Sequence, residues 1–262
     1  MDPARTGPPP VRRGRRLMRA RARVVARADG RGGTRVAELR GESPLLLRST
    51  TAEGGVATVY VVGGAAGPLG GDDLLLEVEV GPGAALRVGS VAASVALPGR
   101  PAAVSRMRVH AVVHAGATLH WVPEQLVAAA GCDHVAESRV ELAAGARLTW
   151  RDELICGRYG ESPGDAVVRT SVDHAGRPLL RQSMAVGPSA PGWAGSAVLG
   201  GAPATGSLLL VEPDGPARPG ARPVTGDDGG SVAWLPLAGG PATLITATAA
   251  AAHTLRERLT PA

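Results

Sequence analysis

Two side chains with soft ligand atoms stand close together in the middle of the sequence. Cys132 and His134 flank Asp133 in a Cys-x-His triplet, and thiolate sulfur and imidazole nitrogen can both bind a transition metal. One triplet supplies too few ligands for a metal centre, and a buried Cys beside a turn Asp is the more common arrangement. We therefore expect no tight metal site here.

The other His residues do not converge on one point. His110 and His114 share one face of an expected strand, but four residues at about 3.3 Å each place them about 13 Å apart, too far to bind one ion. If the chain turns back at Gly116, His120 points to the face opposite His114. His174 lies in a turn-like segment, where a surface role is typical.

Three carboxylates stand in contexts that could face a wet interior channel. Asp72 follows Gly70-Gly71 and precedes an apolar run, Glu124 follows Trp-Val-Pro, and Glu161 closes the segment Gly-Arg-Tyr-Gly-Glu. Each also has an ordinary explanation. Asp72 would cap a turn, Glu124 would be exposed after its proline, and Glu161 would pair with Arg158.

Signatures of the common enzyme classes are missing from the sequence. It contains no His-Glu-x-x-His and no Gly-x-Gly-x-x-Gly segment. It also contains no Lys, which excludes a Walker A phosphate loop and Schiff-base chemistry. We expect a protein that is not an enzyme. A β-fold hydrolase stays open as an alternative, because a Ser/His/Asp triad is recognised by geometry and not by spacing.

The charge is unevenly distributed along the 262 residues. Residues 1–27 hold nine Arg against a single acid, Asp2, within a net charge of +5. We expect residues 1–22 to form a disordered, solvated basic arm and residues 23–262 to form one β domain. The arm could touch an acidic partner. No aromatic residues interleave with its Arg, so we expect no nucleic-acid partner.

Nothing in the sequence directs the chain to a membrane or to secretion. The pair Leu17-Met18 is followed at once by Arg19, whereas a signal peptide needs about 7 to 15 apolar residues. No apolar run approaches the roughly 20 residues of a membrane span. Two Cys do not make a disulfide framework. These features indicate a cytoplasmic protein.

The apolar pattern predicts an all-β fold. Short apolar runs alternate with Gly and Pro turn signals through about residue 240: Leu45–Leu47, Val59–Val62, Leu74–Val80, Met107–Val113 and Val140–Leu142. A weak repeat of strand, Gly-Ala corner and strand centres on Gly83, Gly116 and Gly145. This repeat predicts a layered, solenoid-like β body of stacked antiparallel hairpins. An ordinary β meander is the alternative.

Helical spacing is found only near the C-terminus. We expect a short helix that begins near Thr246 to Ala249 and runs to about Leu259, with Leu255 and Leu259 on one face. Two stretches rich in Gly and Pro, Pro98–Pro101 and Pro213–Gly230, are expected to be loops.

Five short stretches carry a resemblance to a known family. In order and spacing they are similar to motifs of the urease accessory proteins UreD, called UreH in some organisms: Gly67–Leu74, Gly83-Ala84, Trp121–Gln125, Gly157–Glu161 and Asp173–Leu180. The likeness extends over roughly residues 24–260. One segment departs from the family pattern, because Val91, Val95 and Leu97 stand where relatives have Gln, Lys and Tyr.

The resemblance implies a non-catalytic maturation factor for urease. Such a scaffold binds UreF, which recruits the nickel-carrying GTPase UreG, and together they act on apo-urease. It implies no tightly bound cofactor and a nickel ion that is bound only in transit. Oxygen ligands hold such an ion weakly enough to release it, so Asp72, Glu124 and Glu161 are the candidate nickel route. A generic interaction module with a basic arm is a further alternative.

Overall fold

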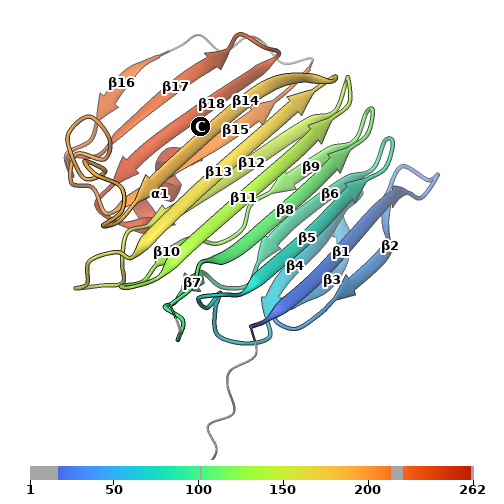
Figure 1. The fold of residues 1–262 in the computed structure, drawn as a ribbon. Helices are drawn as coiled ribbons and strands as arrows, with labels where there is room; N and C mark the ends of the chain where they lie inside the picture. Colours follow the sequence, from blue (N-terminus) through green and yellow to red (C-terminus); the bar gives the residue numbers. More distant parts are fainter. Residues whose placement is uncertain (1–16, 101, 214–220, 261–262) are drawn as a thin grey trace, which may run out of the picture.

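A computed structural model describes residues 17–100, 102–213 and 221–260, and these form two facing β-sheets (Figure 1). The first sheet is seven-stranded, with the order β14-β13-β11-β8-β5-β1-β2. Its strands are β1 (Arg19–Ala28), β2 (Thr34–Gly41), β5 (Asp73–Val80), β8 (Ser105–Val113), β11 (Asp133–Leu142), β13 (Asp165–His174) and β14 (Arg177–Val186).

The second sheet is eleven-stranded, with the order β16-β17-β18-β15-β12-β9-β6-β4-β3 and with β10 and β7 attached beside β12. Its strands are β3 (Leu45–Glu53), β4 (Val56–Gly63), β6 (Ala85–Ser90), β7 (Ser94–Ala96), β9 (Thr118–Trp121), β10 (Leu126–Ala128), β12 (Arg147–Ile155), β15 (Ala204–Val211), β16 (Ala221–Thr225), β17 (Ser231–Leu237) and β18 (Ala242–Ala249). One helix, α1 (Ala252–Leu259), follows.

The expected solenoid-like repeat is confirmed. The pairs β5–β6, β8–β9 and β11–β12 each cross from the first sheet to the second through a Gly-Ala corner. The three corner glycines have φ angles of 66°, 67° and 74°, and the Ala after each glycine is buried. Since a side chain rarely adopts positive φ, glycine is the residue that suits this corner. The all-β fold class with a short C-terminal helix is therefore correct.

The expected strand direction was wrong for the body of the fold. The two strands of a unit lie in different sheets, so they cannot pair with each other as a hairpin. Each instead pairs with the equivalent strand of the next unit, which runs the same way, and the ladders β5–β8, β8–β11, β6–β9 and β9–β12 are all parallel. Antiparallel pairs such as β1–β2, β3–β4 and β13–β14 lie toward the edges.

The expected start of the C-terminal helix was also wrong. Thr246 and Ala249 belong to β18, and α1 begins only at Ala252. Thr and Ile suit a strand because their branched side chains pack well on a pleated surface, and β15 supplies the antiparallel partner. The helix packs Leu255 and Leu259 onto the outer face of the second sheet. No helix among the described residues is long and apolar enough to cross a membrane.

The first strand begins inside the segment expected to be a disordered arm. β1 starts at Arg19, with Ala20 and Ala22 buried and Arg21 exposed between them. It pairs in parallel with β5, which supplies the tertiary partner that the sequence pattern does not reveal. Residues 1–16 lie outside the described residues. In the expected loop Pro213–Gly230, residues 214–220 also lie outside them, and Ala221–Thr225 is the strand β16.

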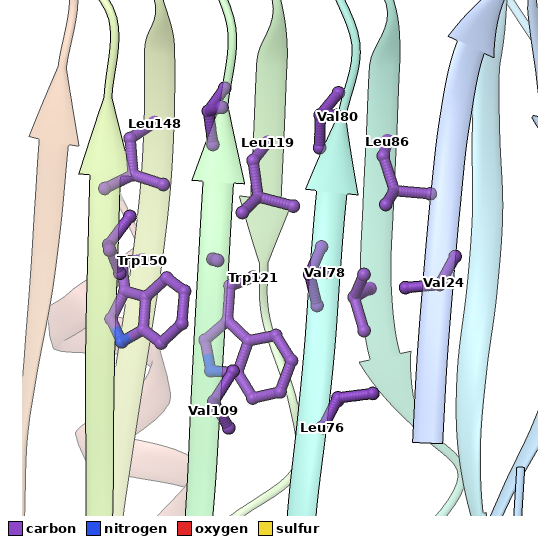
Figure 2. Close-up of a cluster of buried hydrophobic side chains, with 14 of the residues drawn as sticks. Val24, Leu76, Val78, Val80, Leu86, Val109, Leu119, Trp121, Leu148 and Trp150 are labelled. Atoms are coloured by element: carbon purple, nitrogen blue, oxygen red, sulfur yellow. The ribbon is translucent and has the colours of Figure 1, made fainter. Parts of the chain in front are cut away.

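An apolar core fills most of the space between the sheets (Figure 2). In the first sheet, one ladder of neighbouring small side chains crosses five strands: Val24, Val78, Ala111, Val140 and Val172. In the second sheet, Leu86, Leu119 and Leu148 are neighbours in register. Next to them Trp121 and Trp150 stack, with ring centroids 4.9 Å apart and planes inclined by 14°.

Candidate functional site

Toward β14 and β18 the space between the sheets changes from apolar to polar and forms a partly open cavity of about 310 Å³. The first sheet contributes Thr170 and Gln182. The second sheet contributes six more oxygen-bearing side chains that point to the same interior: Asp152, Thr205, Ser207, Ser231, Thr246 and Thr248. We take this cavity as the candidate functional site.

Strand alternation explains why these polar groups face inward. In β15, Leu208 and Leu210 pack in the cluster beneath α1, so Ser207, the residue before Leu208, faces the opposite sheet. There its Oγ donates a hydrogen bond of 3.3 Å to Oε1 of Gln182 on β14. In β18, Ile245 and Ala247 pack toward the helix in the same way, which turns Thr246 into the cavity.

Asp152 is the carboxylate at the centre of this polar interior. Its Oδ2 accepts a hydrogen bond of 2.7 Å from Thr170 Oγ1 and one of 3.0 Å from Trp150 Nε1. Burial raises the pKa of Asp152, and the two hydrogen bonds oppose that rise. Among the described residues that line the cavity, none carries a basic side chain. The charge of Asp152 is therefore not balanced within the cavity.

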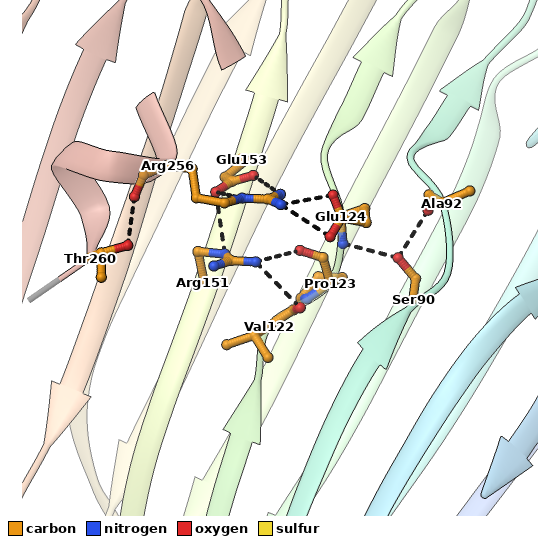
Figure 3. A network of polar contacts seen from close by, with 9 residues as sticks. All are labelled: Ser90, Ala92, Val122, Pro123, Glu124, Arg151, Glu153, Arg256 and Thr260. Carbon is orange, nitrogen blue, oxygen red and sulfur yellow. Dashed lines mark hydrogen bonds and ion pairs between the residues drawn. The ribbon is translucent and has the colours of Figure 1, made fainter. Parts of the chain in front are cut away.

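A second polar group lies on the outer face of the same sheet, beneath α1 (Figure 3). Arg256 reaches from the helix to Glu153, with bonds of 2.7 and 3.1 Å, and to Glu124, with bonds of 2.9 and 3.0 Å. Hydrogen bonds to Glu153 raise the pKa of Arg256 above its ordinary value, with Glu124 contributing further. Only 1% of the Glu153 side chain is exposed, against 29% of the Arg256 side chain, so Glu153 is shielded from water whereas Arg256 is partly exposed.

Arg151 extends the same network toward the segment after β9. Its Nη2 donates to the carbonyl oxygens of Pro123, at 3.0 Å, and Val122, at 3.4 Å. Its Nε lies 3.3 Å from Glu153 Oε1 as an ion pair, without the geometry of a hydrogen bond. The network therefore joins α1, β12 and the Trp-Val-Pro-Glu segment, which are far apart in the chain.

Each of the three carboxylates predicted from the sequence has its own partners. Asp72 caps its turn, as the ordinary explanation expected, because its carboxylate accepts from the backbone N–H groups of Leu69 at 2.9 Å and Met18 at 3.1 Å. Glu161 pairs with Arg158 through bonds of 2.7 and 2.9 Å. These bonds hold the pKa of Glu161 down at about 2.

Glu124 is not simply exposed after its proline, because Arg256 binds it and its backbone N–H donates to Ser90 Oγ at 2.9 Å. The partners of Asp72, Glu124 and Glu161 lie on different elements, and none of the three lines the cavity. The structure thus does not gather them into one site. Their part in a nickel route stays a prediction.

Both Cys residues and His134 are buried in the core. Cys132 and Cys156 pack in one buried cluster, and burial raises the pKa of each thiol to about 11. His134 shares a hydrogen bond of 2.9 Å with Ser105 Oγ, and burial lowers its pKa to about 4. No group of three or more His, Cys, Asp or Glu in the described part of the chain is arranged to hold a metal.

The remaining His residues are dispersed. His110 is exposed on the outer face of β8, and His114 lies 3.8 Å from Glu79. His120 does not lie in a hairpin, because β9 pairs with β6 and β12, and its Nδ1 is 3.1 Å from Thr149 Oγ1. His174 ends β13 and is half-buried, where a surface turn was expected.

Sequence reasoning missed Asp152, Glu153 and Arg256. A signal for Asp152 was available, since it shares a strand face with Trp150 and Leu154, and a charged residue at an apolar position of a buried strand is unusual. No comparable signal marks Arg256, whose bonds to Glu124 span 132 residues of sequence.

Comparison with known proteins gives the same family along almost the whole chain. The model of the family described as UreD urease accessory protein matches residues 18–262. Urease accessory protein UreD 3 of Streptomyces griseus is 51% identical over 247 residues, which cover 92% of this chain and 94% of the relative. Urease accessory protein UreD of Streptomyces avermitilis is 46% identical over 243 residues, covering 92% and 95%.

A relative from another genus agrees. Urease accessory protein UreD of Parafrankia sp. is 46% identical over 265 residues, which cover 94% of this chain and 88% of the relative. These identities hold over nearly full-length chains, and the resemblance drawn from five short motifs is thereby confirmed. The chain belongs to the UreD family of urease accessory proteins.

Proposed function

We propose that this chain assists urease maturation in the cytoplasm as a non-catalytic scaffold. In this role it binds UreF-like and UreG-like accessory proteins and apo-urease, and it helps nickel reach the enzyme. Membership of the UreD family supports the accessory role. The nickel ion is cargo that passes through, and no cofactor is held tightly.

The observation that carries the nickel part of the proposal is the polar cavity inside an otherwise apolar sandwich. Hydroxyl, amide and carboxylate oxygens line it, and each such group costs stability when it is buried without need. Oxygen atoms are also ligands that exchange readily, so an ion in transit is released again. We propose that the ion passes between the sheets through this cavity.

Asp72, Glu124 and Glu161 are proposed to act outside the cavity, along the approach to it. Glu124 supports this best. It shares Arg256 with the buried Glu153, so a cation that engages Glu124 would leave Arg256 with a second carboxylate. Asp72 and Glu161 are held by backbone N–H groups or by an exposed Arg, and we propose only an electrostatic contribution from them.

Co-expression with UreF, UreG and apo-urease tests the proposal. Omitting this chain should abolish most urease activation and lower the nickel content of the purified enzyme. Glu124→Gln and Glu161→Gln should each lower activation partly, and a double Asp72→Asn, Glu161→Gln variant should lower it more than either single change. Glu141→Gln, on an exposed ion pair with Arg139, is the matched control and should have no effect.

Melting temperature and UreF pull-down are measured on the same variants. If activation falls only in step with stability or with partner binding, these carboxylates are structural and the route assignment is wrong. If urease is activated equally well without the chain, the accessory function itself is wrong.

A further inference from the structure

The two ends of the sandwich differ in their exposed apolar side chains. One end, here called the loop end, is where β1, β5, β8, β11 and β13 begin, and the Gly-Ala corners lie at the other end (Figure 1). These five strands run parallel, and β14 runs back against β13. The segments before β1, after β6, after β12 and after β14 therefore meet at the loop end. Four of the seven exposed large apolar side chains of the described residues lie in these segments: Leu17, Val91, Tyr159 and Val198.

Tyr159 is the most exposed of these four side chains and stands in a closed loop between β12 and β13. Glu161 fixes the loop, because its Oε1 accepts hydrogen bonds from the backbone N–H groups of Arg158, at 3.0 Å, and Ala130, at 3.1 Å. The Arg158 side chain adds bonds of 2.7 and 2.9 Å to the same carboxylate. A Cβ at Gly157 would collide with the carbonyl oxygen of Glu161. The loop is thus held by its own backbone and by one ion pair, and the fully exposed Tyr159 ring takes no part in holding it.

Neighbouring loops at the same end support this loop from behind. The N–H of Gly164 donates to the carbonyl oxygen of Ala129 at 3.2 Å, and a Cβ at Gly164 would collide with the backbone of Cys132. In the segment after β14, Ser189 donates to the Asp165 carboxylate from its N–H at 2.7 Å and from its Oγ at 3.0 Å. The loop that presents Tyr159 is therefore ordered before any partner arrives, and such preorganisation lowers the entropy cost of binding.

The loop end also carries basic side chains without a counter-charge. Arg19, Arg100 and Arg106 are exposed, and no ion pair joins any of them to another described residue. The acids at this end offset them only in part. Asp73 is held in an ion pair of 2.5 Å, and Asp133 is exposed at the start of β11. Residues 1–16, which lie outside the described residues, join the chain at this end and carry five further Arg against one Asp. A surface that meets the loop end should therefore be acidic.

A fixed, exposed aromatic ring beside Arg side chains is typical of the anchor of a protein–protein interface, where Tyr and Arg are enriched among the residues that dominate affinity. Single-stranded nucleic acid is bound by several aromatic rings that stack on successive bases, whereas Tyr159 is the one fully exposed aromatic side chain among the described residues. A membrane-binding surface needs a continuous apolar face, and here the apolar side chains stand singly on separate loops. The arrangement fits a protein that offers an apolar pocket bordered by acidic side chains.

We propose that the loop end is the surface by which this chain docks on a protein partner of the urease maturation assembly, with Tyr159 inserted into an apolar pocket and with Arg100 and Arg106 facing acidic side chains of that partner. The inference rests on the proposed accessory function and adds the surface and the anchor through which it acts. The surface is separate from the cavity, since none of these three residues lines it.

Binding of purified UreF and of apo-urease to the full chain, measured separately, tests the anchor. Tyr159→Ser should weaken binding to one of these partners about tenfold or more, whereas Tyr159→Phe keeps the ring and should bind nearly as well as the wild type. Val112→Thr removes an exposed apolar side chain from the outer face of β8 and should leave both affinities unchanged. Because Tyr159 is fully exposed, Tyr159→Ser should keep the wild-type melting temperature. Equal affinity of the wild type and Tyr159→Ser for both partners would overturn the proposal.

The basic side chains are tested by association rates at low and high salt. Arg100→Gln combined with Arg106→Gln should slow association with the same partner about tenfold at low salt, and the difference should shrink as salt is raised. Arg31→Gln combined with Arg35→Gln removes the same charge from exposed positions at the corner end and should slow association less. Equal slowing by the two pairs would show that net charge alone attracts the partner, and the placement at the loop end would be wrong.

Other occupants of the loop end are tested on the same variants. Sedimentation with vesicles of phosphatidylcholine and phosphatidylserine measures membrane binding, and light scattering measures the oligomeric state of the chain alone. If Tyr159→Ser abolishes vesicle binding or a dimer of this chain while binding to UreF and apo-urease is unchanged, the assignment to a partner protein is wrong. If the wild type binds neither UreF nor apo-urease, the proposed function fails together with this inference. If the wild type binds one of them and Tyr159→Ser binds it equally, this inference alone fails.

Discussion

The two halves of the sandwich use one architecture for opposite interiors. Near β1 and β5, inward positions are Val, Leu and Ala, and the sheets close on a solid core. Near β14 and β18, the same alternation places Thr, Ser, Gln and Asp inward, and the interior is hollow. Alternation decides which residues point inward in both halves. The chemistry of those residues decides whether the interior is filled or kept open.

Substitutions in the two interiors should give the largest difference in unfolding free energy. Leu119→Ala in the solid half should cost about 4 kcal/mol of unfolding free energy, because neighbouring side chains cannot collapse into the space. Thr246→Val in the cavity wall should change stability by less than about 1 kcal/mol, since it replaces a hydroxyl by a methyl group of similar size. Urea unfolding measures both, and equal losses would abolish the distinction.

Removal of Arg256 should come next in size. Arg256→Ala leaves the buried Glu153 with Arg151 alone, at 3.3 Å, and should cost about 3 kcal/mol, the lower end for breaking a buried pair. Arg139→Ala, at an exposed pair with Glu141, is the control and should cost less than about 1 kcal/mol. A small loss for Arg256→Ala would show that water reaches Glu153.

The pH dependence of stability should reveal the protonation of His134 on unfolding. Its folded-state pKa is about 4, whereas an unfolded His titrates near 6.5, so the unfolded chain takes up a proton first as the pH falls. Stability should therefore decline below about pH 6.5 and be lower by about 2 kcal/mol at about pH 5. Urea unfolding across this range should show a flatter profile for His134→Asn. The exposed His110→Asn should keep the wild-type slope.

The smallest predicted effect is the coupling between the stacked Trp residues at the boundary of the two interiors. A double-mutant cycle with Trp121→Leu and Trp150→Phe should give a coupling energy of about 1 kcal/mol. Trp121→Leu combined with Trp234→Leu should give a value near zero, because Trp234 packs in the separate cluster with α1. Equal coupling in both cycles would mean that the ring stacking contributes nothing specific.

The sequence by itself determined the fold class, the corner positions and the family. Alternating apolar runs and glycines before small residues are local features. They can be recognised in a sequence without knowing which strand pairs with which. Gly83, Gly116 and Gly145 could therefore be aligned before the sheets were known, and each has the positive φ that the corner requires. The motif around Glu124 pointed to the family by the same kind of local pattern.

Only the tertiary structure decided the strand direction, the start of α1 and the contents of the cavity. Parallel pairing depends on which sheet each strand joins, and β18 is a strand because β15 lies beside it. Asp152 meets Thr170 across the two sheets, and Arg256 meets Glu124 across 132 residues. Burial and charge pairing arise from such long-range contacts. A sequence pattern therefore shows where the carboxylates are, but not which of them has no basic side chain as a partner.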